Sequence, residues 1–366
     1  MNTSYEIDFL PVGNGERSGD AICMRYGTPG NYTVMVYDGG TKESGEKLVK
    51  HIKTFYGTSH VDYVVCSHPD ADHASGLSVV LEQLSVGELW MHRPWEHSKL
   101  ILDYFHDGRI TDTSLAERLK DKMAAAYALE ELAQENGIPI REPFQGAQIG
   151  DFYVLSPDSD WYVHELIADF EKSPDKKKAA EAQNNSLVNF LLAAAKDAVL
   201  KAAESWGIET LREDVCTSAE NESSVVLFGV IDERGILFTG DAGVQALSKA
   251  AGYAEERNVS IPGYIKFAQV PHHGSRNNVS PSVLDRLLGP KSASPVSDAQ
   301  TTAFVSAGKE SETHPRKMVV NAFLRRKAKV MVTKGRSIRH HHQMGTREGW
   351  TAIESLSFSQ EVESWD

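Results

Sequence analysis

The sequence has few cysteines and no long apolar run. Its three cysteines, Cys23, Cys66 and Cys216, are too few and too scattered to form a disulfide framework or a thiolate zinc site. The longest apolar stretch, near residues 187–200, is interrupted by polar and charged residues and is too short to span a bilayer. The first 20 residues lack the basic stretch and apolar run of a signal peptide. We therefore predict a cytoplasmic protein that makes no contact with a membrane.

Low-complexity segments and internal repeats are also absent, so the composition is that of a globular protein. Hydrophobic residues make up 41% and charged residues 24% of the chain, which excludes disordered and collagen-like proteins. A chain of 366 residues can form one large domain or two ordinary ones. We predict a single domain over residues 1–366 that carries a helical insertion, or cap, at residues 158–220.

Charge is distributed unevenly along the chain. The net charge is −13, with 38 basic and 51 acidic residues, yet residues 305–347 contain eleven basic and only two acidic residues. One interpretation of this basic segment is a solvated helix face followed by a basic tail; the other is a patch that receives an anionic substrate. In the second case Arg325, Arg326 and Lys327 guide a nucleic acid towards the site, and activity on it depends strongly on salt.

Alternating strand and helix patterns predict a layered α/β fold. The first 66 residues contain four β-rich runs and one helical stretch, at residues 5–12, 21–26, 33–37, 61–66 and 46–56. Later segments predict helices at 115–136 and 161–207, and a hairpin of two strands at 225–230 and 236–239. The run that ends at Cys66 leads directly into a polar loop, where functional sites are commonly built.

This loop concentrates side chains that can bind metal. His68, Asp70, Asp72 and His73 lie within six residues, and imidazole with carboxylate is a ligand set for zinc, manganese or iron. A polar turn that caps the next helix is the alternative, but such a turn needs only one of the four side chains. Together with Asp241, which ends a later strand, and the histidine pair at 272–273, they supply the ligands of a two-metal site.

In this order the motifs resemble the metallo-β-lactamase superfamily. More closely, the chain resembles the soluble hydrolase domain of the competence protein ComEC and its free-standing relatives. Five further segments match that branch: Val12-Gly-Asn-Gly15 with Asp20-Ala-Ile, Asp38-Gly-Gly40, Leu155-Ser-Pro157, Asn221-Glu-Ser-Ser224, and Ser306-Ala-Gly308 leading to His314-Pro315. The resemblance covers roughly residues 5–333.

The resemblance implies a four-layer αββα sandwich with helical insertions and a site for two divalent metal ions, zinc or manganese. The implied ligands are His68 and Asp70 for the first ion, Asp72, His73 and one histidine of the 272–273 pair for the second, and Asp241 as the bridge. We expect only one histidine of the pair to be a ligand, because neighbouring residues of an extended strand point to opposite faces. Of the two, we favour His272.

The sequence departs from the general superfamily at the first metal site. Asp70 stands where many relatives carry histidine, and a carboxylate there favours manganese alongside zinc. No histidine lies close before Asp241 to act as the third ligand of the first ion; His92 and His97 either line the pocket or are packing residues. The insertion at 158–220 covers the site or binds a protein partner. A second Asn-Asn-Ser-Leu-Val at 184–188 leaves open whether the insertion precedes or follows it.

These features predict a phosphodiesterase or nuclease that acts on a nucleic acid or nucleotide through a metal-bridged hydroxide. Asp72 belongs to the catalytic set because its metal orients the hydroxide. His273 and His314 are candidates for the general acid or oxyanion contact, and Ser275, Asn221 and His314 for substrate contacts. The first alternative is a metallo-hydrolase of a small ester, lactone or phosphocholine-like substrate. The second is a non-catalytic interaction protein with a degenerate metal site.

Overall fold

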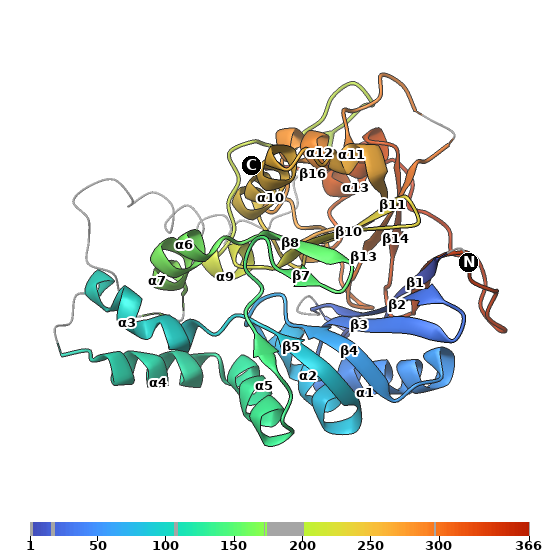
Figure 1. Ribbon diagram of the computed structural model, residues 1–366. Helices are drawn as coiled ribbons and strands as arrows, with labels where there is room; N and C mark the ends of the chain where they lie inside the picture. Colours follow the sequence, from blue (N-terminus) through green and yellow to red (C-terminus); the bar gives the residue numbers. More distant parts are fainter. Residues whose placement is uncertain are drawn as a thin grey trace.

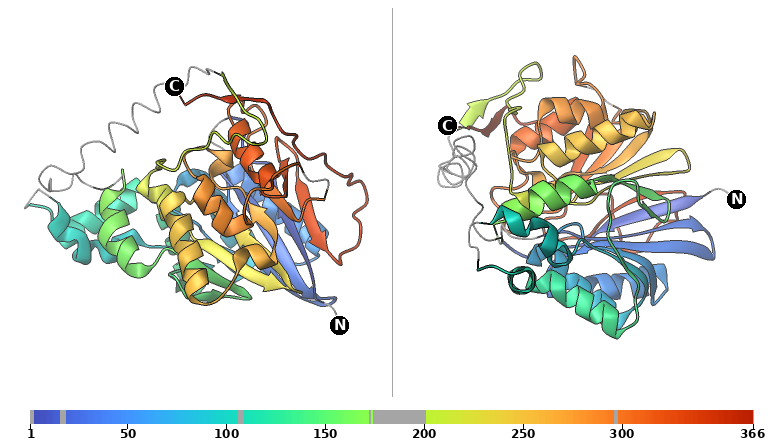
Figure 2. Two further views of the ribbon diagram at one scale, coloured as in Figure 1. Left: turned by 90° about the horizontal axis from the view of Figure 1, so that it is seen from above. Right: turned by 60° about the vertical axis from the view of Figure 1, so that its left-hand side comes forward.

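The computed structural model describes residues 3–15, 19–105, 109–171, 173, 201–295 and 298–365. These residues form two seven-stranded β-sheets that face each other, with helices on the outer surfaces (Figures 1 and 2). This architecture confirms the αββα sandwich and is consistent with a metallo-β-lactamase fold. The middle of the insertion, including the second Asn-Ser motif at 184–188, lies outside the described residues.

The N-terminal sheet has the strand order β15-β1-β2-β3-β4-β5-β6. Its strands are β1 (Ser4–Phe9), β2 (Ala21–Thr28), β3 (Asn31–Gly39), β4 (His60–Val65), β5 (Ser85–Trp90), β6 (Ile140–Arg141) and β15 (Ile338–His342). Strands β3 to β6 run parallel, so their carboxyl ends share one edge of the sheet. The loop with the metal-binding motif follows β4 at that edge.

The C-terminal sheet has the strand order β14-β13-β12-β11-β10-β8-β7. Its strands are β7 (Gln148–Ile149), β8 (Phe152–Ser156), β10 (Val226–Ile231), β11 (Arg234–Phe238), β12 (Ile265–Gln269), β13 (Thr301–Val305) and β14 (Ala328–Val332). Strands β10 and β11 form the predicted hairpin. Its two turn residues, Asp232 and Glu233, both have positive φ (51° and 59°), as a type I′ turn requires.

Helices cover the outer face of each sheet. The longest are α1 (Lys42–His51), α2 (Ala71–Gln83), α4 (Asp112–Lys122) and α5 (Ala124–Glu135) on the N-terminal side, and α10 (Val244–Glu256), α12 (Pro281–Leu288) and α13 (Lys317–Arg325) on the C-terminal side (Figure 1). The helical stretch predicted over 115–136 is divided at Met123, whose φ of −115° interrupts the helix. Within the described ranges, no helix is both long enough and apolar enough to cross a bilayer.

One part of the predicted helical stretch at 161–207 is a strand. Residues of β9 (Lys201–Ala203) pair antiparallel with β16 (Glu361–Glu363) near the C-terminus. The prediction of a helix that ends at Gly207 was therefore wrong for these residues, because pairing with a distant segment outweighs local helix propensity. Earlier in the insertion, α6 (Ser159–Trp161) and α7 (Ile167–Asp169) flank a π-helical turn at Tyr162–Leu166.

Aromatic side chains fill the space between the two sheets. Phe9, Phe267 and Phe304 are fully buried there and pack edge to face, with ring centroids 5.2–5.9 Å apart. On the other face of the N-terminal sheet, α2 approaches β3 through glycine. A Cβ atom on Gly76 would lie 1.9 Å from the carbonyl oxygen of Gly39, so only glycine permits this contact. The close approach places the first turn of α2 over the end of β3.

Two arginines of the basic segment are buried, contrary to both interpretations of that segment. Arg325 and Arg326 are 0% and 2% exposed. Arg325 Nη2 lies 3.1 Å from Glu204 Oε2, and Arg326 Nη1 lies 2.7 Å from Glu209 Oε1. The prediction that these two residues guide a nucleic acid was wrong, because two buried glutamates require their charge. Lys327 is half-buried.

Candidate metal centre

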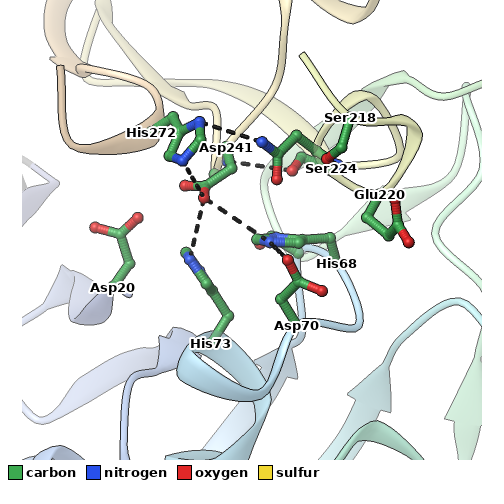
Figure 3. A network of polar contacts seen from close by, with 12 residues as sticks. Asp20, His68, Asp70, His73, Ser218, Glu220, Ser224, Asp241 and His272 are labelled. Carbon is green, nitrogen blue, oxygen red and sulfur yellow. Dashed lines mark hydrogen bonds and ion pairs between the residues drawn. The ribbon is translucent and has the colours of Figure 1, made fainter. Parts of the chain in front are cut away.

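The candidate metal centre lies where the carboxyl ends of central strands from both sheets meet (Figure 3). β4 leads into the loop that carries His68 and Asp70, and the first turn of α2 carries His73. From the other sheet, β11 leads to Asp241 and β12 leads to the turn with the histidine pair 272–273. The structure thus brings together motifs that are separated by about 170–200 residues in the sequence.

Four histidines surround the carboxylate of Asp241. From Asp241 Oδ2, the distance to Nε2 is 3.3 Å for His73, 3.7 Å for His272, 3.9 Å for His68 and 3.9 Å for His273. Asp241, His68, His73 and His273 are all buried, whereas the His272 side chain is 31% exposed. All four imidazoles therefore direct the same ring nitrogen towards one carboxylate.

On the N-terminal side, Asp38 determines which nitrogens carry protons. Its carboxylate accepts hydrogen bonds from Ser67 N (2.7 Å), Ser67 Oγ (2.6 Å) and His73 Nδ1 (3.0 Å). Because the Ser67 hydroxyl donates its proton to Asp38, its oxygen accepts from His68 Nδ1, 2.9 Å away. Both histidines are thus protonated at Nδ1, and their Nε2 atoms face Asp241.

On the C-terminal side, Asn278 and the backbone carbonyl of Ser306 provide the acceptors for the Nδ1 atoms of the histidine pair. Asn278 Nδ2 donates to the carbonyl oxygen of Asp241 (2.8 Å), so its Oδ1 accepts from His272 Nδ1 at 2.9 Å. His273 Nδ1 lies 3.2 Å from the carbonyl oxygen of Ser306, which can only accept. Each of the four Nδ1 atoms thus has an acceptor, and in the neutral form of each imidazole a proton on Nδ1 leaves the lone pair on Nε2, the arrangement that prepares histidine to bind metal.

A divalent cation fits this arrangement. His68 Nε2, His73 Nε2 and Asp241 Oδ1 are buried and have no hydrogen-bond partner among the described residues. Buried polar atoms without a hydrogen bond are unfavourable, and a divalent cation bound between the imidazoles and the carboxylate would satisfy them. The ligand atoms of His73, Asp241 and His273 lie within 4.8 Å of one another, and so do those of Asp38, His68 and His73.

Electrostatics within the centre couple metal binding to pH. Burial alone would raise the pKa of Asp241, but His73, His272 and His273 outweigh it and hold the pKa well below its usual range. Burial lowers the pKa of His73, but Asp241 and Asp38 outweigh burial and raise it well above its usual value. Burial lowers the pKa of His273 to about 4. A proton and a cation compete for the Nε2 lone pair of His73, so acid weakens metal binding.

Asp70 and His272 form the open side of the centre. The Asp70 side chain is 31% exposed, and its Oδ2 lies 3.7 Å from His68 Nε2. Asp72 is half-buried in the first turn of α2 and makes no hydrogen bond or ion pair with the described residues. The assignment of Asp70 and Asp72 as metal ligands stays a prediction.

The histidine pair does not lie in an extended strand. Both residues belong to a 3₁₀ turn at His272–Gly274, with φ of 45° for His272 and 56° for His273. This left-handed backbone lets both side chains reach Asp241, so the alternation of an extended strand, on which the choice of a single ligand rested, does not apply. The compact group with His73 and Asp241 contains His273, whereas the favoured His272 lies at the rim.

The three residues predicted to contact substrate lie around this turn. Asn221 Nδ2 lies 3.2 Å from His272 Nδ1 and donates to Thr217 Oγ1 at 2.7 Å. Ser275 Oγ accepts from the backbone nitrogen of Asn277, within the turn. His314 is half-buried, and its charge contributes to the low pKa of His273 after burial and nearer charged groups. Their functional roles stay predictions.

Several residues of the centre had no role assigned from the sequence. Asp38 belongs to the Asp-Gly-Gly motif after β3, and its positive φ of 58° marks an unusual backbone position. Ser67 directly precedes the metal loop, but nothing in the sequence distinguishes Asn278.

His92 and His97 lie outside the centre. His92 stacks on Tyr162 with ring centroids 4.3 Å apart, and His97 contacts Glu142 at 3.1 Å.

One family model matches part of the chain. Residues 24–144 match the model of a family described as the metallo-beta-lactamase superfamily. The matched segment includes β3, β4, the metal loop and α2. Members of this superfamily are metal-dependent hydrolases. No curated protein matches the chain significantly.

Three solved structures show a distant similarity to this chain. The hydrolase AbOPH in the beta lactamase superfamily is 10% identical over 73% of this chain and 86% of that chain, with a TM-score of 0.34. The Rm3 metallo-beta-lactamase is 12% identical over 68% and 72%, with a TM-score of 0.28. A new diphosphatase from the PhnP family is 10% identical over 92% and 98%, with a TM-score of 0.36. Likenesses of this size assign no substrate, and the resemblance to ComEC stays a prediction.

Proposed function

We propose that the protein is a metal-dependent hydrolase that cleaves phosphodiesters. The observation that carries this proposal is the convergence of four imidazole Nε2 atoms on the buried carboxylate of Asp241. Such a centre is costly to fold, because His68 Nε2, His73 Nε2 and Asp241 Oδ1 are buried without a hydrogen bond to the described residues. A bound divalent cation offsets this cost and gives the centre a catalytic use.

The residues of the chain have separable tasks in this reaction. A divalent cation, when bound, supplies Lewis acidity and lowers the pKa of water to about 7. Asp38, Ser67 and Asn278 hold the imidazoles in the tautomer that binds it. Asp70 and His272 lie at the open side, where a substrate approaches. His314, near His273, is the candidate for the proton delivered to the leaving oxygen.

A phosphodiester is the substrate class that this ligand set favours. Carboxylate is a hard ligand, and Asp70 beside His68 suits manganese as well as zinc, the ions commonly used on phosphate oxygens. The burial of Arg325 and Arg326 removes two cations from any surface path for a long polyanion. We therefore expect a small diester or nucleotide to be a better substrate than a long nucleic acid.

A substrate panel tests this proposal. Purified protein is assayed with added Mn²⁺ or Zn²⁺, and after chelation, on a chromogenic bis-aryl phosphodiester, an aryl phosphomonoester, an aryl acetate, a lactone and single-stranded DNA. We expect the diester to be cleaved fastest, with Mn²⁺ at least as effective as Zn²⁺, and the activity to disappear on chelation. Cleavage of the lactone or the acetate without the diester would contradict the substrate class. Absence of metal-dependent hydrolysis on every substrate would contradict the hydrolase.

A further inference from the structure

Asp20 is a second buried carboxylate beside Asp241. It lies in the loop between β1 and β2, is 2% exposed, and stands next to His73 and Asp241 in Figure 3. Burial raises its pKa to about 7, and the charges of His73 and Asp241 act on it in opposite directions. No task in the proposed reaction has yet been assigned to this side chain.

Gln269 fixes the position of Asp20 from the opposite sheet. Gln269 is 1% exposed at the end of β12, and its Oε1 accepts from the backbone nitrogens of Thr239 (2.8 Å) and Gly240 (3.0 Å). Because Oε1 is committed to these two donors, Nε2 must donate to Asp20 Oδ2, 2.8 Å away. The same amide therefore holds Asp20 and the loop that ends at Asp241.

The pairing of these carboxylates suits a cation. Two buried carboxylates that act on each other cannot both ionise easily unless a positive charge lies close to both. Among the residues that the structure describes, the compact ligand group near Asp241 contains His73 and His273 and does not contain Asp20. Asp20 is thus placed outside the direct ligands but close enough for its charge to act on an ion that they bind.

We propose that Asp20 is a positioning residue of the metal centre: held by Gln269, it stabilises from outside the ligand set the cation that His73, Asp241 and His273 bind. This inference rests on the proposed function, since it requires that the centre bind metal. It adds a residue from the β1–β2 loop and a hydrogen bond between the two sheets to the machinery of the site.

Asp20→Asn tests the inference, because asparagine can still accept from Gln269 but carries no charge. Dissociation constants and stoichiometry for Mn²⁺ and Zn²⁺ are measured by titration calorimetry and metal analysis, and the melting temperature is measured without metal. We expect the affinity for at least one ion to fall by about 10- to 100-fold with little change in melting temperature. The matched control is Asp62→Asn on β4. Asp62 Oδ2 accepts a hydrogen bond from Val34 N at 2.8 Å, and asparagine can still accept it. This variant should bind metal like the wild type.

The outcomes separate this inference from the proposed function. A wild type that binds metal, together with Asp20→Asn that binds it equally well, overturns the role of Asp20 only. A wild type that binds no divalent ion overturns the proposed function and, with it, this inference. If Asp20→Asn does not fold, Gln269→Leu is tested instead. This variant keeps the charge of Asp20 but removes the hydrogen bond that holds its carboxylate, and it must weaken metal binding. Wild-type affinity in a folded Gln269→Leu overturns the inference.

Discussion

Two of the buried clusters of histidine and aspartate in the described part of the chain differ in what neutralises the carboxylate. The Asp8 cluster consists of Asp8, Cys23 and His51, and the Asp241 cluster of His73, Asp241 and His273. Both are buried, and in each the ligand atoms lie within 4.8 Å of one another. Proximity of ligand atoms therefore does not distinguish them.

The Asp8 cluster already contains a cation. Arg347 binds both oxygens of Asp8 through Nη1 and Nη2, each at 2.7 Å, and Tyr56 donates to Oδ2 at 2.8 Å. Burial alone would raise the pKa of Asp8, but His51 and Arg347 outweigh burial and lower it. The guanidinium thus occupies the position that a metal ion would need.

In the Asp241 cluster, by contrast, some of the buried ligand atoms have no hydrogen-bond partner among the described residues. His73 Nε2 and Asp241 Oδ1 are buried and have no hydrogen-bond partner within the described part of the chain, although His73 Nδ1 and His273 Nδ1 have acceptors. The comparison shows that a metal site is better recognised by buried lone pairs that nothing satisfies than by the proximity of histidine and aspartate. The following changes test that distinction.

Asp241→Ala should have the largest effect. The substitution removes the carboxylate on which four imidazoles converge, so we expect metal content to fall below one ion per chain and activity to disappear. Metal analysis of the dialysed variant measures the first effect, and circular dichroism verifies the fold. Two ions per chain in the variant would refute the bridging role of Asp241.

Arg347→Met should damage stability but not metal binding. Asp8 would remain buried without its bidentate partner, and breaking a buried ion pair costs about 3–5 kcal/mol. Urea unfolding measures this loss, and metal analysis should give the wild-type stoichiometry. If the variant instead gained an ion at the Asp8 cluster without loss of stability, proximity alone would be sufficient for binding.

His92→Phe should alter the pH dependence of stability. Burial lowers the pKa of His92 to about 3, below the value of about 6.5 in an unfolded chain. The neutral form is therefore favoured in the folded state, and stability is complete above pH 6.5 and falls as the pH drops towards 3, by at most about 1.4 kcal/mol per pH unit.

The phenylalanine variant should lose less stability than the wild type between about pH 6.5 and pH 4.5, as measured by urea unfolding. Its metal stoichiometry should not change, because none of the candidate ligand groups among the described residues includes His92. Parallel pH profiles for the two proteins would show that His92 is not responsible for the acid sensitivity.

Lys329→Glu should have the smallest effect. Lys329 is exposed on β14, so we expect a change in stability of less than about 0.5 kcal/mol and unchanged cleavage of a small diester. The contrasting variant is Arg326→Met, which leaves Glu209 buried without its partner and should be strongly destabilised. Equal stability of the two variants would contradict the burial of this ion pair.

The sequence predicts the local elements better than the pairing of distant residues. The strands, the hairpin at 225–239 and the metal loop follow from periodicity, turn residues and spacing. The burial of Arg325 could not be predicted, because its partner Glu204 lies 121 residues away and no local pattern connects them. The strand at 201–203 was not predicted either, because the strand with which it pairs lies far away in the sequence, at 361–363.

The candidate centre shows the same limit. Its ligand types were visible in the motifs, but the acceptors that orient the imidazoles were not. Asp38 and Asn278 are separated from the histidines they hold by different intervals, 35 residues from His73 and 6 from His272, so no single spacing identifies such partners. Only the folded structure shows that all four Nδ1 atoms have acceptors and that all four Nε2 atoms face Asp241.

Anomalous diffraction from crystals grown with Zn²⁺ or Mn²⁺ is the most direct test of the distinction between the two clusters. The account predicts a strong anomalous peak among His73, Asp241 and His273, and none beside Asp8, where Arg347 holds the carboxylate. A peak beside Asp8, Cys23 and His51 with none at Asp241 would contradict it.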